Sequence, residues 1–218
     1  MFTDREEAAH RLAEALQHYR GRNPLVLAIP RGAVPMARIL TEELGGDLDV
    51  VLVHKLGAPG NPEFAIGAVG EDGTREVSEE AHRLGISQDY IAEEAERQLQ
   101  TLRQRRQRYT PVREPLDPSG RNVIVVDDGI ATGATMQAAL KTLRPRGPQS
   151  LVAAVAVAPP DAAKRLESVA DEVVCLQTPY DFFAVGQFFR NFEQVSDDDV
   201  VAILQGYGSS RQGDEGAS

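Results

Sequence analysis

One stretch decides the fold of this chain: Val123-Ile124-Val125-Val126-Asp127-Asp128-Gly129-Ile130-Ala131-Thr132-Gly133-Ala134-Thr135. Four branched apolar residues in a row predict a buried strand of a parallel sheet that is covered on both faces. Asp127 and Asp128 follow at its carboxyl end, where open α/β sheets place their ligands. Small and hydroxyl residues then lead into an apolar pattern at residues 136–143 that is typical of a helix. The stretch therefore predicts a strand, a polar loop and a helix around a ligand.

The polar residues of this stretch suit a ribose phosphate. Two adjacent carboxylates can accept hydrogen bonds from two vicinal hydroxyl groups. The first N–H groups of the following helix have no acceptor within the helix, and they favour an anion. An ordinary strand-to-helix turn is the alternative interpretation, but all of these residue types in fixed order favour the site.

Length and charge limit the class of protein. A chain of 218 residues is within the size of one α/β domain with a sizeable core. Its 23 basic and 33 acidic residues give a net charge of −10, which opposes general attraction to nucleic acid or to an anionic membrane. Any anion site must therefore be local.

The single cysteine and the hydropathy pattern bear on location. Cys175 lies in an apolar run, so we expect a buried strand residue rather than a nucleophile, and no disulfide can form within the chain. The N-terminus lacks an apolar signal core, and no segment approaches the ~20 apolar residues of a membrane span. We expect a cytoplasmic protein.

Strand and helix patterns alternate along the chain. This alternation predicts a doubly wound, mainly parallel sheet of about five strands flanked by helices. Between the core units we expect one strand over residues 49–56, a hairpin through residues 65–77, and a long helix from Ser87 to Tyr109. The tail from Gly208 has the composition of a disordered segment.

Two further segments are candidate anion-binding sites. Gly32 follows a buried strand and opens a helix, so backbone N–H groups near it could bind an anion and Arg31 could add charge; a turn with a surface arginine is the alternative. Lys55 ends a strand beside a glycine-rich loop, as expected for a cation that closes over a polyanion. Its neighbour His54 points the other way along a strand, so we favour Lys55 and expect a packed or solvent-facing His54.

The run 123–135 closely resembles the phosphoribosyl pyrophosphate (PRPP) motif of the type I phosphoribosyltransferases. The segments Pro30-Arg31-Gly32, residues 55–63 and residues 185–189 are also similar to those of a group of bacterial predicted phosphoribosyltransferases. The resemblance implies a Rossmann-like core with a small hood that covers the base. We expect a single domain over 1–207, with the hood built from 1–22 and 178–207, a helical insertion at 78–110, and a disordered tail at 208–218.

The resemblance implies a magnesium-dependent transferase of nucleotide salvage. It would transfer the 5-phosphoribosyl group of PRPP to a nucleobase-like acceptor and release pyrophosphate. Asp127, Asp128 and Lys55 would be catalytic, and Mg²⁺ would bind through PRPP, with the two acids reaching it through water. The ribose and 5′-phosphate would contact Asp127, Asp128, Gly129, Ala131, Thr132, Gly133, Ala134 and Thr135. Pyrophosphate would contact Arg31, Gly32 and Lys55, and the base would contact Ile130, Phe182 or Phe188.

The acceptor and the oligomer stay open at this point. The 6-oxopurine enzymes of the family carry an acid where this chain has Ala131, so we expect hypoxanthine and guanine to be poor acceptors. Some members complete their sites across a dimer, which allows a homodimer here. The arginines at 103–108 fit a solvated helix end, although one or two could reach a phosphate. A regulator that senses PRPP or a nucleotide without turnover is the alternative function.

Overall fold

The computed structural model describes residues 1–110 and 115–212, apart from the side chains of Glu63, Glu80 and residues 208–212. Its centre is a five-stranded parallel sheet in the order β2-β1-β6-β7-β8. These strands are β1 (Leu25–Ala28), β2 (Asp47–Val50), β6 (Asn122–Asp127), β7 (Ser150–Val157) and β8 (Glu172–Gln177). The predicted fold class is confirmed. The central strand β6 ends at Asp127, the first residue of the loop 127–135 that we call the acid motif.

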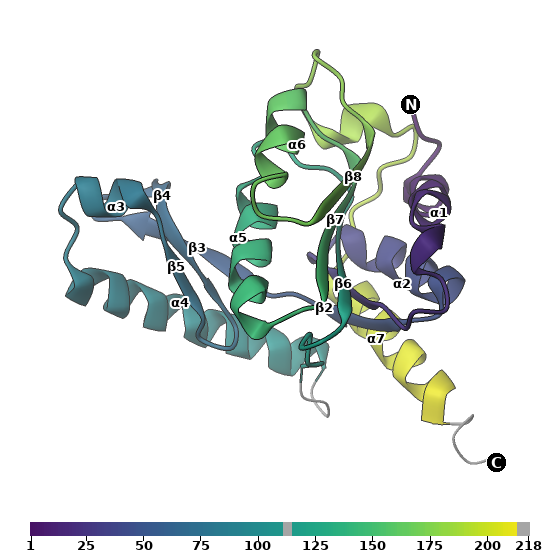
Figure 1. Cartoon of the computed structure of the whole chain (residues 1–218), viewed down its shortest axis with the longest axis horizontal. Helices are drawn as coiled ribbons and strands as arrows, with labels where there is room; N and C mark the ends of the chain where they lie inside the picture. Colours follow the sequence, from purple (N-terminus) through teal and green to yellow (C-terminus); the bar gives the residue numbers. More distant parts are fainter. Residues whose placement is uncertain (111–114, 213–218) are drawn as a thin grey trace.

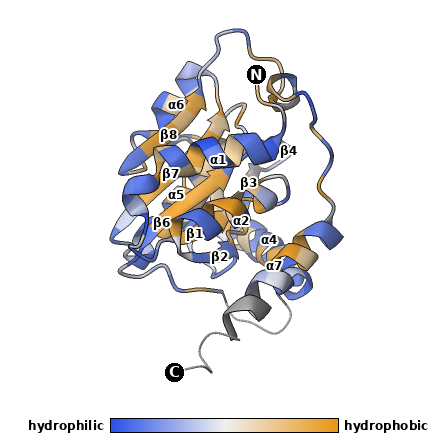
Figure 2. Ribbon diagram, turned by 90° about the vertical axis from the view of Figure 1, so that its right-hand side faces the viewer, coloured by the Kyte–Doolittle hydropathy of each residue, from blue (hydrophilic) through white to orange (hydrophobic). Residues whose placement is uncertain are grey.

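Helices cover both faces of this sheet (Figure 1). Alternate residues of β1 belong to separate cores, with Val26 in one and Leu27 in the other, because successive side chains of a strand point to opposite faces. One face is covered by α1 (Arg5–Ala15), α2 (Ala33–Leu44) and α7 (Asp197–Gln212), and the other by α5 (Ala134–Leu143) and α6 (Pro160–Leu166). Figure 2 shows that the strands of the central sheet are mostly hydrophobic, whereas α1 is largely hydrophilic.

A second, antiparallel sheet projects beside the central one (Figure 1). It contains β3 (Val53–Ala58), β4 (Asn61–Gly70) and β5 (Arg75–Val77), and it is followed by α3 (Glu79–Arg83) and α4 (Gln88–Tyr109). We call residues 53–109 the arm. The hairpin and the long helix capped by Ser87 are confirmed, since Ser87 Oγ accepts a 3.2 Å bond from the Tyr90 N–H.

The predicted single strand over residues 49–56 is wrong. The chain leaves the parallel sheet after Val50, and β3 starts at Val53 in the other sheet. The Val51 N–H donates a 3.0 Å bond to the carbonyl oxygen of Ala28, where the neighbouring strand ends. Polar residues that follow, such as His54 and Lys55, are half-buried in the arm.

Arg106 fastens the arm to the central sheet. Its guanidinium donates to both carboxylate oxygens of Glu71 in the arm, to Asp49 of β2 at 2.7 Å, and to the Val50 carbonyl at 2.8 Å. Burial alone would lower the pKa of Arg106, but the two carboxylates raise it overall, and burial raises the pKa of Glu71. The solvated-face interpretation of the arginine cluster is therefore wrong for Arg106.

The two terminal segments lie together. Phe2 forms an isolated parallel bridge with Phe189, with a 2.7 Å bond from the Phe2 N–H to the Phe188 carbonyl. The first helix, α1, packs on α2 and on the sheet. At the other end α7 continues to Gln212, past the predicted start of the tail at 208, and the remaining tail at 213–218 lies outside the described residues. Among the described residues, none of the helices has the length and hydropathy that crossing a membrane requires.

Candidate functional site

The paired acids lie at the carboxyl end of β6, in the middle of the sheet. Asp127 is the last residue of the strand, and its Oδ1 accepts a 2.9 Å bond from the Asp128 N–H. Burial raises the pKa of Asp127 well above its usual range, and the charge of Asp128 raises it further. Burial also raises the pKa of Asp128, against the opposing effect of Arg5. The two carboxylates are therefore poorly solvated acceptors that a hydrogen-bonding ligand would stabilise.

Arg5, the first residue of α1, reaches this acid pair. Its Nε donates a 2.7 Å bond to Asp128 Oδ2, and both side chains are largely buried, at 13% and 12% exposure. Sequence patterns contain no sign of this contact, because a single arginine at a helix start is a common surface residue and the partner lies 123 positions away.

The predicted pyrophosphate loop packs against the acid pair. It connects β1 to α2, and a β-carbon added at Gly32 would lie 2.1 Å from Asp128 Oδ2. Only glycine allows this approach. The neighbouring Arg31 is partly exposed, and its Nη1 lies 3.9 Å from Asp197 Oδ1. Two of the three predicted motifs are therefore adjacent in space.

The loop between Asp128 and α5 has the geometry of an anion site. Gly133 adopts a left-handed φ of 75° and caps the helix, and Thr132 Oγ1 accepts a 3.4 Å bond from the Ala134 N–H. Thr132, Ala134 and Thr135 are exposed, so an anion can approach the first turn of the helix. One unpredicted side chain lies beside the loop: Arg165 of α6 donates to the Thr132 carbonyl at 3.1 Å.

Lys55 lies in the arm, in the third position of β3 and opposite Ala68 of β4. It is half-buried, close to the point where the chain leaves the central sheet. His54 directs its Nδ1 to the backbone carbonyl of Lys55, at 2.9 Å, which agrees with a packed histidine. The placement of Lys55 at the root of the arm keeps it a candidate for contact with an anion.

Residues 180–192, which follow β8 and which we call the aromatic segment, lie against the acid motif. A β-carbon added at Gly129 would lie 2.5 Å from Val185 Cγ1, so the two segments touch. The rings of Phe182 and Phe188 stack at 5.3 Å and pack partly on the core. Ile130 is only 4% exposed, which leaves its side chain little surface for a base.

Gln187 holds the tip of this segment. Its Oε1 accepts bonds from the Phe183 and Ala184 N–H groups, at 2.9 and 3.0 Å, and its Nε2 donates to the Asp181 carbonyl at 2.8 Å. Phe183 itself is 91% exposed. Gln187 thus fixes the backbone of residues 181–184, and the Phe183 ring lies in solvent.

Asp197 connects the start of α7 to the end of α4. It accepts 2.6 Å bonds from the Tyr109 hydroxyl and from Arg108 Nη1. The bond from Tyr109 lowers the pKa of Asp197, and burial raises the pKa of Tyr109 to about 12. Asp197 lies in the first turn of α7, and through Arg31 it also lies near the pyrophosphate loop.

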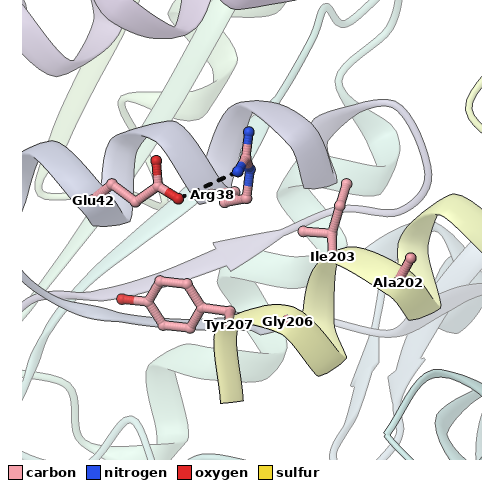
Figure 3. Close-up of a pocket in the computed structure, with 6 residues that line it drawn as sticks. All are labelled: Arg38, Glu42, Ala202, Ile203, Gly206 and Tyr207. Carbon is pink, nitrogen blue, oxygen red and sulfur yellow. Dashed lines mark hydrogen bonds and ion pairs between the residues drawn. The ribbon is translucent and has the colours of Figure 1, made fainter. Parts of the chain in front are cut away.

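A cavity of about 410 Å³ lies elsewhere, between α2 and α7 (Figure 3). Its lining residues are Arg38, Glu42, Ala202, Ile203, Gly206 and Tyr207. The Tyr207 hydroxyl bonds to the carbonyl of Gly46, which precedes β2, so this cavity lies toward the amino ends of the strands. It contains none of the predicted site residues.

The side chains of the site suit a metal ion that binds together with the substrate. Within the described ranges 1–110 and 115–212, no three His, Cys, Asp or Glu residues are grouped as a metal site. Asp127 and Asp128 supply two carboxylates, whereas Mg²⁺ takes six oxygen ligands, often from one or two carboxylates, water and substrate phosphates. The acid pair fits that kind of partial coordination.

A family model, two curated relatives and a solved structure all match most of this chain. Residues 4–190 match the family model of the phosphoribosyl transferase domain. Two curated relatives, each called "Putative phosphoribosyl transferase", come from Mycobacterium tuberculosis strains H37Rv and CDC 1551; each is 46% identical over 206 residues. The match covers 94% of this chain but 46% of each relative, so the chain spans about half their length. The crystal structure of TT1426 from Thermus thermophilus is 50% identical, with a TM-score of 0.87, and the match covers 94% of this chain and 98% of that one.

Proposed function

This chain belongs to the phosphoribosyl transferase domain family, and on that premise we propose that it transfers the 5-phosphoribosyl group of PRPP to a nucleobase-like acceptor and releases pyrophosphate. The observation that carries the proposal is the contact between two motifs far apart in the sequence. Gly32 of the predicted pyrophosphate loop lies directly against Asp128 of the acid motif. Pyrophosphate and ribose are joined in PRPP, so their binding groups must be adjacent in this way.

Each part of PRPP has a matching group in the proposed mechanism. Asp127 and Asp128 accept hydrogen bonds from the ribose hydroxyls and orient the ring. The first turn of α5 anchors the 5′-phosphate through its N–H groups, beside the hydroxyls of Thr132 and Thr135. Gly32, Arg31 and Lys55 hold the leaving pyrophosphate. The acceptor nitrogen then attacks the anomeric carbon as the bond to pyrophosphate breaks, through an oxocarbenium-like transition state.

Catalysis in this scheme rests on positioning and charge. The chain forms no covalent bond with the substrate, so alignment of the acceptor with the anomeric carbon supplies much of the rate increase. Asp127 and Asp128 would reach Mg²⁺ through water, and the bound metal would neutralise charge on the leaving pyrophosphate. The two carboxylates also place negative charge near the ring, where positive charge develops.

For the acceptor, we propose a nucleobase-like ring other than hypoxanthine or guanine. Ala131 is exposed and has no group that could bond the polar edge of a 6-oxopurine. The aromatic segment after β8 is the candidate base contact, through Phe182 or Phe188. Such an acceptor would give the protein a role in nucleotide salvage.

The test is a pyrophosphate-release screen with PRPP, Mg²⁺ and a panel of purine, pyrimidine and other nitrogen heterocycles. We expect release with at least one acceptor and its loss in the Asp127→Asn/Asp128→Asn double variant. PRPP binding without release across the whole panel would favour the alternative, a PRPP-sensing regulator. Neither binding nor release would refute both functions.

A further inference from the structure

The contact between Arg5 and the acid motif has no role in the mechanism proposed above. Arg5 is the first residue of α1, and its side chain crosses to Asp128, where Nε bonds Oδ2 at 2.7 Å. Its Nη2 lies 3.1 Å from the point that a β-carbon on Gly32 would occupy. One guanidinium thus lies beside both the ribose acid and the pyrophosphate loop.

Phe192 and Glu193, which follow the turn held by Gln187, also contact Arg5. Nη1 of Arg5 donates a 2.6 Å bond to the Glu193 carbonyl, and the guanidinium carbon lies 3.8 Å from the centre of the Phe192 ring. A cation over an aromatic face gains about 0.5–2 kcal/mol, depending on desolvation. The planar guanidinium is therefore fixed by two neighbours before it meets Asp128.

This arrangement constrains the carboxylate of Asp128. Oδ2 is bound to Arg5 and faces Gly32, so the side chain cannot rotate without breaking a largely buried ion pair. The orientation in which this carboxylate meets a substrate hydroxyl is thereby fixed. A carboxylate held in one orientation loses less entropy when it binds than a freely rotating one does.

We propose that Arg5 is a positioning residue of the PRPP site, which fixes the charge and the orientation of Asp128 for the ribose and is itself steadied by Phe192 and Glu193. This inference rests on the proposed function. It also gives the first helix and the segment at 192–193 a shared role at the site, because both act on the same carboxylate through one side chain.

Two other roles for the same contact predict different results. If the ion pair only anchors α1 to the sheet, its loss lowers stability and leaves PRPP affinity unchanged. If Arg5 masks Asp128 from the substrate, its removal tightens PRPP binding. A positioning role alone predicts weaker binding that depends on the presence of Asp128.

The experiment is calorimetry of PRPP with Mg²⁺ on Arg5→Gln, Arg5→Lys, Asp128→Asn and the Arg5→Gln/Asp128→Asn pair. We expect Arg5→Gln to weaken PRPP binding by about tenfold or more, the scale of a lost hydrogen bond to a charged group. Arg5→Lys should recover part of the affinity, because it keeps the charge without the fork. In the Asp128→Asn background, Arg5→Gln should have little further effect. Phe192→Leu should cause a smaller loss than Arg5→Gln.

Arg11→Gln is the matched control. Arg11 lies on the same helix and also stacks on a ring, that of Phe2 at 5.0 Å, but its ion pair is with Glu7 on the surface. We expect unchanged PRPP affinity in this variant. Thermal unfolding of every variant identifies any that fails to fold. If Arg5→Gln does not fold, the PRPP affinity of Arg5→Lys tests the role of residue 5.

Two outcomes overturn the inference while the proposed function stands. In both, the unmodified protein binds PRPP. In the first, folded Arg5→Gln binds PRPP as tightly as the unmodified protein or more tightly. In the second, Arg5→Gln lowers PRPP affinity by the same factor whether residue 128 is Asp or Asn. Failure of the unmodified protein to bind PRPP refutes the proposed function, and this inference with it.

Discussion

Replacing Arg106 with methionine should strongly destabilise the protein. Methionine keeps part of the apolar stem but removes a guanidinium that bonds Asp49, Glu71 and the Val50 carbonyl. The side chains of Asp49 and Glu71 are 1% and 12% exposed, so both carboxylates would lose their cation in a poorly solvated place. Breaking a buried ion pair by removing one partner costs about 3–5 kcal/mol.

Thermal unfolding followed by circular dichroism measures this effect. For a domain of this size 1 kcal/mol corresponds to about 2–4 °C, so the midpoint should fall by about 6–20 °C. Arg103→Met is the control on the same helix, because Arg103 is 60% exposed and its pair with Glu96 is at 4.0 Å. Such surface pairs contribute about 0–1 kcal/mol.

The pH dependence gives the prediction a second test. Burial already raises the pKa of Glu71 in the folded state, and without Arg106 this carboxylate also loses the cation that lowers its pKa, so the folded variant binds more protons than the unfolded chain. Stability relative to the unmodified protein should therefore recover as the pH falls. An Arg106→Met midpoint within about 2 °C of the unmodified protein, less than 1 kcal/mol, would refute the buried-network reasoning.

The remaining predictions concern the site. Lys55→Ala should lower kcat more than PRPP affinity if its charge acts mainly in the transition state, and equal losses would indicate ground-state binding. Gly32→Ala should weaken PRPP binding by about tenfold or more, because its β-carbon would collide with Asp128, while Gly206→Ala, with open space around it, should not. Asp127→Asn should raise stability at neutral pH, since the raised pKa of Asp127 means that its charge costs folding energy; this gain should vanish as the pH falls and Asp127 becomes protonated. Hypoxanthine and guanine should be about tenfold or more poorer than the preferred acceptor, and efficient turnover of either would contradict the role given to Ala131.

Local patterns predicted the parts of the fold whose cause is local. The strand before Asp127 followed from a run of branched residues, and the start of α2 followed from Gly32. The start of α4 followed from Ser87. The acid motif and the loop around Gly32 could be expected to lie side by side, because both follow the carboxyl ends of strands in one parallel sheet.

What sequence patterns missed depends on contacts between distant residues. The bond from Arg5 to Asp128 and the bond from Arg106 to Asp49 connect segments 123 and 57 positions apart. Neither arginine has a local pattern that separates it from a surface residue. The break between β2 and β3 was missed for a similar reason, because it is set by the end of the neighbouring strand at Ala28.

The most direct test of the proposed PRPP site is calorimetric titration of the protein and its Asp127→Asn/Asp128→Asn variant with PRPP in the presence of Mg²⁺. We predict saturable binding to the unmodified protein, and a loss of more than ~1 kcal/mol in the folded variant, the scale of charged hydrogen bonds. No binding to the unmodified protein, or equal affinity in the two proteins, would contradict the assignment of the acid motif as a ribose-phosphate site.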